Sequence, residues 1–303
     1  MSEKLPAISL VAVPGRRQAT LELAGEIERR GFSGLYVPSM FGNIAQCVAM
    51  ALATRTIVFG TAVSPIYAAT VQEFAQSAAF MHEISGGRLR FGIGVAHAPS
   101  HRRLGVTVGK PLADTSAFVA AFKAQDTFGP LPPVVLAALR RRMVALAGEI
   151  ADGLIFANGS RSHMGQSLAA LPPEKRADPD FLIANMIPTV ISDDPAAARA
   201  VHRRTLTRYA MLPNYRNYWK EAGYVEEMAA VEQAIDEGRD ADVPNRLSDR
   251  WVDDATLSGS PTQIRDGLAA WRDAGVTTPI LVPSSTCGNQ LVALQEIFAA
   301  FAA

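Results

Sequence analysis

Few side chains in this sequence have the types and spacing that catalysis requires, and histidine gives the clearest candidates. His97 and His101 are four residues apart, the spacing of a helical zinc pair, but Pro99 lies between them and no glutamate follows His97. The sequence therefore predicts no metal site. Lysine, the residue of Schiff-base chemistry, lies away from every predicted strand end, at Lys4, Lys110, Lys123, Lys175 and Lys220.

The elements that would position such side chains follow a regular order of strand, then helix. Apolar runs rich in β-branched residues alternate with helix-patterned segments such as 20–30, closed by Gly31, and 71–84, closed by Gly86 and Gly87. The runs predict eight strands, at residues 7–13, 34–38, 56–64, 88–96, 133–138, 153–157, 181–191 and 278–283.

Eight such units predict an α/β protein with the (β/α)8 fold of a TIM barrel. The alternative is an open doubly wound sheet, but the first strand is followed by Val13-Pro14-Gly15-Arg16, which lacks the GxGxxG nucleotide fingerprint. We therefore predict a single barrel domain over residues 1–303.

The connection between the seventh and eighth strands is far longer than usual and predicts a helical insertion before the last strand. The pattern indicates helices at 194–210, 221–236 and 255–274, and a polar and aromatic turn at 213–218. Two interpretations stay open for the insertion: packing or dimer-forming helices, and a cover over one end of the barrel.

Active sites of such barrels are built from the loops at the carboxyl ends of the strands. Here these loops offer one histidine and almost no carboxylates, which disfavours metal-dependent hydrolysis and paired-carboxylate glycoside cleavage. An apolar mouth with few polar groups suits a planar organic cofactor that brings its own reactivity. The loops are residues 38–40, 64–67, 95–99, 138–140 and 158–160.

Charge and cysteine content limit the partners and the location of the protein. The 303 residues carry 29 basic and 29 acidic side chains, so electrostatic attraction to nucleic acids or anionic membranes is not expected, and we predict a small-molecule partner. Cys47 and Cys287 form neither a disulfide framework nor a zinc motif. Together with the lack of a secretory signal or a long apolar segment, this predicts a cytoplasmic protein.

Several segments carry, in the right order, a resemblance to a known family. They are residues 56–67 (TIVFGTAVSPIY), 74–97 (FAQSAAFMHEISGGRLRFGIGVAH), 136–139 (LAAL) with 146–153 (LAGEIADG), and 259–262 with 274–276. They resemble the bacterial-luciferase-like family, particularly its branch dependent on coenzyme F420, a deazaflavin. The resemblance implies a luciferase-like TIM barrel, a homodimer, and an oxidoreductase that transfers a hydride between F420, or alternatively FMN, and a small organic substrate.

The resemblance also assigns roles to individual residues. It implies a cis peptide bond after Ala62, in a bulge that supports one face of the cofactor ring. It places the phosphate end of the cofactor at the loops after strands five and six. In the first of these loops, the arginines from Arg140 onward replace the family's Gly-Pro, and in the second, residues 158–160 form a polar nest. The predicted cofactor-binding residues are Ser39, Met40, Ala62, Val63, Ser64, Gly94, Ala96, Ala138, Leu139, Arg140, Arg141, Asn158 and Gly159.

Two departures from the family pattern bear on catalysis. Sugar-phosphate dehydrogenases of the deazaflavin branch have an Asp-His pair where this chain has Ser39-Met40, and a glutamate where it has His97. We predict that His97 is the catalytic residue, because its side chain can exchange a proton near neutral pH, and that replacing His101, in the same loop but further from the rim of the barrel, has little effect on turnover. Two alternatives stay open: an FMN-dependent monooxygenase of the same fold, and a barrel that has lost catalysis and only binds a ligand.

Overall fold

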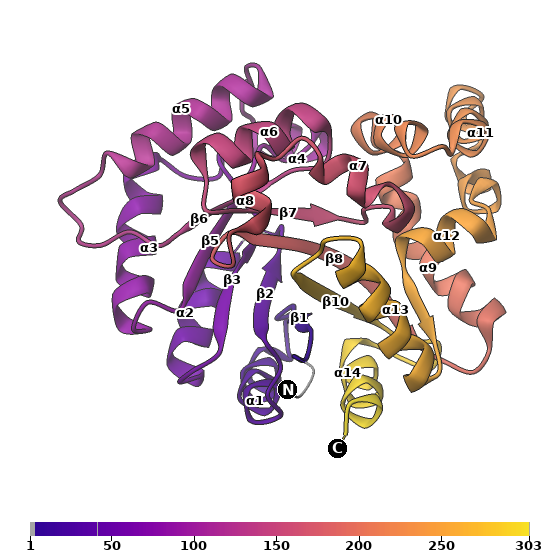
Figure 1. Ribbon diagram of the computed structural model, residues 1–303, viewed down its shortest axis with the longest axis horizontal. Helices are drawn as coiled ribbons and strands as arrows, with labels where there is room; N and C mark the ends of the chain where they lie inside the picture. The colour runs from indigo at the N-terminus through magenta and orange to yellow at the C-terminus, as the bar shows by residue number, and fades with distance from the viewer. Residues whose placement is uncertain (1–3, 41, 303) are drawn as a thin grey trace. The chain divides into compact units, whose positions relative to one another are not determined.

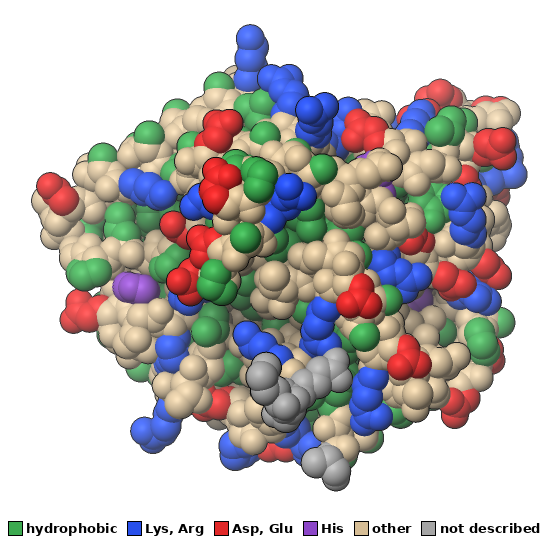
Figure 2. Space-filling view, in the orientation of Figure 1, with side chains coloured by type: hydrophobic (Ala, Val, Ile, Leu, Met, Phe, Trp, Pro, Cys, Tyr) green, Lys and Arg blue, Asp and Glu red, His purple; other side chains and the backbone are tan. Residues whose placement is uncertain are grey.

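The computed structural model describes residues 4–40 and 42–302, which divide into two compact units. The first unit comprises Met1–Phe156 and Leu168–Ala184, and the second comprises Ala157–Ser167 and Asn185–Ala303. Within the described ranges, no helix combines the length and the apolar character needed to cross a membrane. On the face drawn in Figure 2, acidic and basic side chains are interspersed.

The first unit is built on a parallel sheet. Its strands lie in the order β1 (Ala7–Ser9), β2 (Gly34–Pro38), β3 (Val58–Ala62), β5 (Leu89–Gly94), β6 (Val134–Ala137) and β7 (Gly153–Ala157), and the short β4 (Ser64–Pro65) pairs with β5. Pro38 is aligned with Ala62, and Pro65 with Gly94. The segments that follow β2, β3 and β5 therefore leave the sheet at the same edge.

Helices cover the strands of this unit. They are α1 (Arg17–Arg29), α2 (Asn43–Ala53), α3 (Val71–Ile84), α4 (Ala98–Leu104), α5 (Pro111–Lys123), α6 (Arg141–Ile150) and α8 (Pro173–Ala177). α1 and α2 pack on β2, α2 also packs on β3, and α3 packs on β5 (Figure 1). Between α3, β5 and α5, the rings of Phe74, Phe91, Phe118 and Phe122 contact one another with centroids 5.1 to 6.2 Å apart.

The helix end predicted at Gly86 and Gly87 is confirmed, and the arginine that follows binds the segment between α2 and β3. Gly86 and Gly87 have φ angles of 64° and 85°, the left-handed conformation that glycine adopts at lowest cost after a helix. The Arg88 guanidinium donates to the carbonyl oxygens of Ala51, Thr54 and Ile57 at 2.9 to 3.0 Å. This arginine therefore has a structural role.

The second unit contains the rest of the strands and the insertion. β8 (Leu182–Ile191) pairs in parallel with β9 (Leu257–Gly259) and also pairs with β10 (Thr278–Ser284). The helices are η1 (Arg161–His163), α7 (Met164–Leu168), α9 (Pro195–Ala210), α10 (Pro213–Glu221), α11 (Val225–Asp236), η2 (Asp240–Arg246), α12 (Asp249–Ala255), α13 (Pro261–Asp273) and α14 (Gln290–Ala300).

The predicted (β/α)8 order and the helical insertion before the last strand are confirmed, with three local corrections. The predicted strand 56–64 is divided into β3 and β4. The predicted turn at 213–218 is wrong, because Pro213 occupies the first position of α10, where its missing N–H has no cost. The predicted helix 255–274 is also wrong in its first part, since β9 lies between α12 and α13.

Candidate active site

The segment between β3 and β4, where the bulge is predicted, contains a cis peptide bond. The Ala62–Val63 peptide bond is cis, which confirms the prediction, and Ala62, Val63 and Ser64 are all buried. Asn43, the first residue of α2, donates from Nδ2 to the Val63 carbonyl at 3.3 Å and accepts from Ser64 Oγ at 3.1 Å. One buried amide thus holds both residues that follow the cis bond.

A second side chain of α2 holds the end of β1. Gln46 donates from Nε2 to the Leu10 carbonyl at 2.8 Å and accepts from the Ala12 N–H at 3.0 Å. The sequence analysis missed Asn43 and Gln46. The available signal was two amide side chains three residues apart, directly after Gly42, at the start of an apolar helix.

Gly94 brings the bulge and β5 into close contact. A Cβ atom at this position would lie 2.8 Å from the Ala137 Cβ and 3.0 Å from the Val63 Cγ2, closer than packed carbon atoms allow. A glycine is therefore required for Val63 to lie directly on β5. Of the other predicted residues at this edge, Ser39 is exposed and Met40 is half-buried.

His97 follows β5 at a point where the backbone has an unusual conformation. Ala96 has a φ of 58°, which is disfavoured for a residue with a Cβ, and His97 is the extended N-cap residue of α4. The imidazole is half-buried. Burial lowers its pKa below the ordinary value, and the nearby His101 lowers it further, so His97 is neutral at pH 7.

His101 supports the segment that carries His97. Its Nε2 donates to the Val95 carbonyl at 2.6 Å, and its ring meets the edge of Tyr67 with centroids 5.5 Å apart. The Tyr67 hydroxyl donates to Asp114 Oδ2 at 2.5 Å, and that oxygen also accepts from the Gly109 N–H at 2.8 Å. His101 is bonded to the residue that precedes Ala96, and this contact leads us to expect a larger effect of replacing His101 than the sequence alone indicates.

Basic side chains surround the start of α6. Arg140 is the N-cap residue of this helix, and Arg140, Arg141 and Arg142 are exposed. Ala138 and Leu139 before them are buried, and the Ala138 N–H donates to the Ile155 carbonyl at 3.0 Å. Guanidinium groups at a helix N-terminus favour an anion, so a phosphate contact at Arg140 and Arg141 stays a prediction.

The loop after β7 is held by hydrogen bonds throughout. The N–H of Gly159 donates to Asn185 Oδ1 at 3.3 Å, that of Ser160 to the Tyr218 hydroxyl at 3.0 Å, and that of Ser162 to Asp254 Oδ1 at 2.9 Å. These N–H groups already have acceptors. A phosphate at residues 158–160 would therefore compete with these protein acceptors for the backbone N–H groups, and the predicted polar nest and the assignment of Asn158 and Gly159 to cofactor binding stay predictions.

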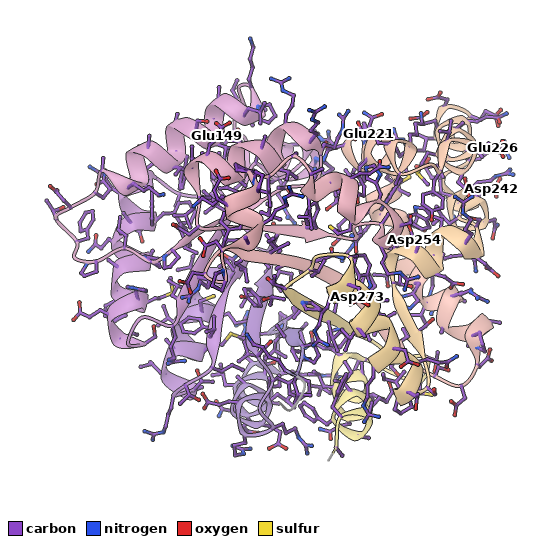
Figure 3. The ribbon with its side chains drawn as sticks, in the orientation of Figure 1. Glu149, Glu221, Glu226, Asp242, Asp254 and Asp273 are labelled. Atoms are coloured by element: carbon purple, nitrogen blue, oxygen red, sulfur yellow. The ribbon has the colours of Figure 1, made fainter. Side chains whose placement is uncertain are left out.

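Two of these three acceptors, Tyr218 and Asp254, come from the insertion, which the sequence analysis did not connect with this loop. Asp254 on α12, labelled in Figure 3, also accepts from Ser162 Oγ at 2.8 Å. Trp219 on α10 donates from Nε1 to the Asn158 carbonyl at 3.2 Å. Within the second unit, the insertion therefore contacts the loop that follows β7.

Metal ligands do not converge within the described part of the chain: residues 4–40 and 42–302 contain no group of three or more His, Cys, Asp or Glu side chains able to hold an ion.

Comparison with known proteins identifies the family. The family model described as luciferase-like monooxygenase matches residues 8–278. Rv3520c of Mycobacterium tuberculosis, named as a coenzyme F420-dependent oxidoreductase, is 27% identical over 87% of this chain and 90% of its own length.

Two solved structures share the fold. The coenzyme F420-dependent tetrahydromethanopterin reductase from Methanopyrus kandleri has a TM-score of 0.77 at 15% identity, over 97% of both chains. The oxygenating constituent of 3,6-diketocamphane monooxygenase from Pseudomonas putida, in complex with FMN, has a TM-score of 0.63 at 14% identity, over 92% of this chain and 91% of that one. These likenesses show the (β/α)8 barrel fold. Because the family model matches most of the sequence, the chain belongs to the luciferase-like monooxygenase family, whose relatives named here are oxidoreductases.

Proposed function

We propose that this protein is an F420-dependent oxidoreductase that moves a hydride between the deazaflavin and a small organic substrate. The observation that carries the proposal is the half-buried His97, whose pKa is lowered by burial, at the same sheet edge as the bulge of Ala62, Val63 and Ser64. The F420-dependent relatives support the choice of cofactor.

The residues of the chain fit such a cofactor. Val63 and Gly94 give an apolar wall that suits one face of a flat ring, and Asn43 holds that wall in place. Arg140 and Arg141 at the start of α6 supply positive charge for a phosphate. When bound, the deazaflavin would supply the hydride chemistry, while the protein orients it and excludes water.

His97 would donate or accept the proton that accompanies hydride transfer. A neutral imidazole has one ring nitrogen that carries a proton and one that accepts a proton, so the side chain can act in either direction. Its lowered pKa keeps the accepting nitrogen available at neutral pH. Ser39 and Met40, which stand where some relatives have Asp-His, cannot take over this role.

Titration of the purified protein with F420 and with FMN tests the proposal. We expect micromolar or tighter binding of F420 and weaker binding of FMN. Binding of neither cofactor would contradict the proposal and support a barrel that has lost catalysis.

The second candidate is an FMN-dependent monooxygenase, favoured by the name of the matching family and by the FMN-bound structure with the same fold. The reverse order of affinities, together with oxygen consumption in the presence of reduced FMN, would establish it in place of the F420 enzyme.

A further inference from the structure

A single carboxylate oxygen joins two segments that lie on either side of His97 along the chain. Asp114, in the first turn of α5, accepts at Oδ2 from the Tyr67 hydroxyl at 2.5 Å and from the Gly109 N–H at 2.8 Å. A Cβ atom on Gly109 would lie 2.5 Å from Asp114 Oδ1, so a glycine at this position lets the carboxylate approach the backbone. A charged acceptor makes such hydrogen bonds stronger than those between neutral groups.

The Tyr67 hydroxyl is a hydrogen-bond donor at neutral pH. Burial of the side chain raises its pKa, and the bond to Asp114 raises the pKa further, so the hydroxyl keeps its proton. The side chain is half-buried and follows β4. The bond to Asp114 therefore fixes the place of the Tyr67 ring.

This ring contacts the residue that supports the segment with His97. Tyr67 meets His101 nearly at a right angle, with an interplanar angle of 87° and ring centroids 5.5 Å apart. His101 in turn donates from Nε2 to the Val95 carbonyl at 2.6 Å. The contacts form a continuous chain from Asp114 on α5 to the residue two positions before His97.

The backbone before His97 adopts a conformation that needs support from its surroundings. Ala96 has a φ of 58°, which costs free energy for a residue with a Cβ, and residues 95–97 are only half-buried. Such a conformation persists where neighbouring contacts impose it. The hydrogen bond from His101 to Val95 is one such contact, directly next to Ala96.

We propose that Asp114 and Tyr67 are positioning residues for His97: acting through His101, they hold residues 95–97 and limit the range over which the imidazole moves. The inference rests on the proposed function, in which His97 exchanges a proton, and adds to it two residues that act through others. All of these residues lie in the first unit.

The test must separate this role from a role of Asp114 in α5 alone. An acidic side chain in the first turn of a helix is stabilised by the helix dipole, so replacing Asp114 lowers the melting temperature even without a link to His97. Tyr67→Phe avoids this ambiguity, because it removes one oxygen, leaves the net charge unchanged and keeps the ring against His101.

NMR titration of the histidine ring signals against pH reports on His97 without any substrate, and His97→Ala identifies its signal among the five histidines. Burial lowers the pKa of His97, and a less restrained segment would expose the imidazole to water. In Tyr67→Phe, the proton affinity of the His97 ring should therefore rise about threefold.

Two variants of Asp114 isolate its hydrogen bond from its charge. Asp114→Ala and Asp114→Asn both lose the negative charge, but asparagine keeps a side-chain oxygen for the Tyr67 hydroxyl. The proton affinity of His97 should be about threefold higher in the alanine variant than in the asparagine variant. Asp126→Ala, at an exposed position after α5, is the control and should leave this affinity within about 1.5-fold.

An unchanged proton affinity of His97 in folded Tyr67→Phe would overturn the inference. A rise in that variant without a difference between the two Asp114 variants would remove Asp114 from the positioning role. Titration of the unchanged protein with F420 tests the function separately. Binding of F420 with no effect of Tyr67→Phe would overturn the inference alone, whereas the expected effect without F420 binding would support the positioning role and overturn the proposed function.

Discussion

The segments after β5 and after β7 begin alike and are supported in opposite ways. Each has a non-glycine residue in the left-handed region among its first two residues, Ala96 with a φ of 58° and Asn158 with a φ of 57°. The segment from Val95 to His101 is half-buried or exposed, and the bond from His101 to Val95 comes from its own helix. The loop from Asn158 to Ser162 is bonded to side chains of β8, α10 and α12.

From this difference we expect residues 95–101 to change conformation more easily than residues 158–162. A backbone with few buried contacts opens locally at lower cost than one held by several elements. A proton-transferring residue benefits from small adjustments, whereas donors for a fixed ligand benefit from being held in advance. His97 lies in the first kind of segment and Asn158 in the second.

The largest effect should come from His97→Ala. A general acid or base contributes about a hundredfold to ten-thousandfold in rate, so turnover with F420 should fall by at least about a hundredfold. The affinity for F420 should stay within about tenfold, since the predicted wall and phosphate contacts lie elsewhere. Steady-state kinetics and cofactor titration separate the two quantities. A loss of cofactor binding in a folded variant would make His97 a binding residue instead.

Asp254→Ala should show how much the hydrogen bonds from α12 to the loop after β7 contribute to stability. The change removes the buried carboxylate that accepts from the N–H and hydroxyl of Ser162, which is itself exposed, and should lower the free energy of unfolding by about 2 kcal/mol. Urea denaturation measures this value. Asp253→Ala, at a more exposed position of the same helix, is the comparison and should cost about 1 kcal/mol or less. Equal costs would show that the loop depends little on α12.

His101→Leu should have a moderate effect on the first segment. Without the bond to Val95, we expect turnover to fall by about tenfold while the free energy of unfolding changes by about 1 kcal/mol. His101→Gln places an N–H2 donor near the position of Nε2 and should restore most of the activity. If glutamine and leucine give the same turnover, the hydrogen bond does not position His97.

The smallest effect is expected at Ala96 and Asn158, the two residues with a left-handed backbone conformation. Ala96→Gly removes a Cβ that disfavours this conformation, and should raise the free energy of unfolding by at most about 1 kcal/mol. Asn158→Gly should show no gain, because asparagine tolerates the conformation and the loop is already held. Urea denaturation of both variants checks the contrast. A larger gain in the free energy of unfolding at position 158 than at position 96 would show that the backbone strain lies in the loop after β7.

The sequence predicts the order of strands and helices well because short apolar runs indicate the strands and glycines indicate the helix ends. The runs at 34–38 and 153–157 match β2 and β7 to the residue, and α3 matches the predicted helix 71–84. Proline was less informative: Pro213 is compatible with a turn and with a first helical residue, and only the packing of α10 decides between them.

The partners of buried polar side chains could not be predicted in the same way. Asn43 bonds to a residue 20 positions away, and Asp254 bonds to one 92 positions away. Such pairs depend on how distant elements pack, which local patterns do not reveal. The resemblance did supply the cis bond after Ala62, since that feature belongs to a motif within a single segment.

The residues of α2 that stabilise the fold differ from the residues of the loop between β2 and α2 that are exposed to solvent. Asn43 and Gln46 secure the ends of β1 and β3 from within the helix, while Ser39 is exposed and Met40 is half-buried. Positions 39 and 40 can therefore diverge between relatives, as Ser39-Met40 does from Asp-His, with little penalty to the barrel. For a protein engineer, these two positions are the natural place to randomise when a new substrate is sought.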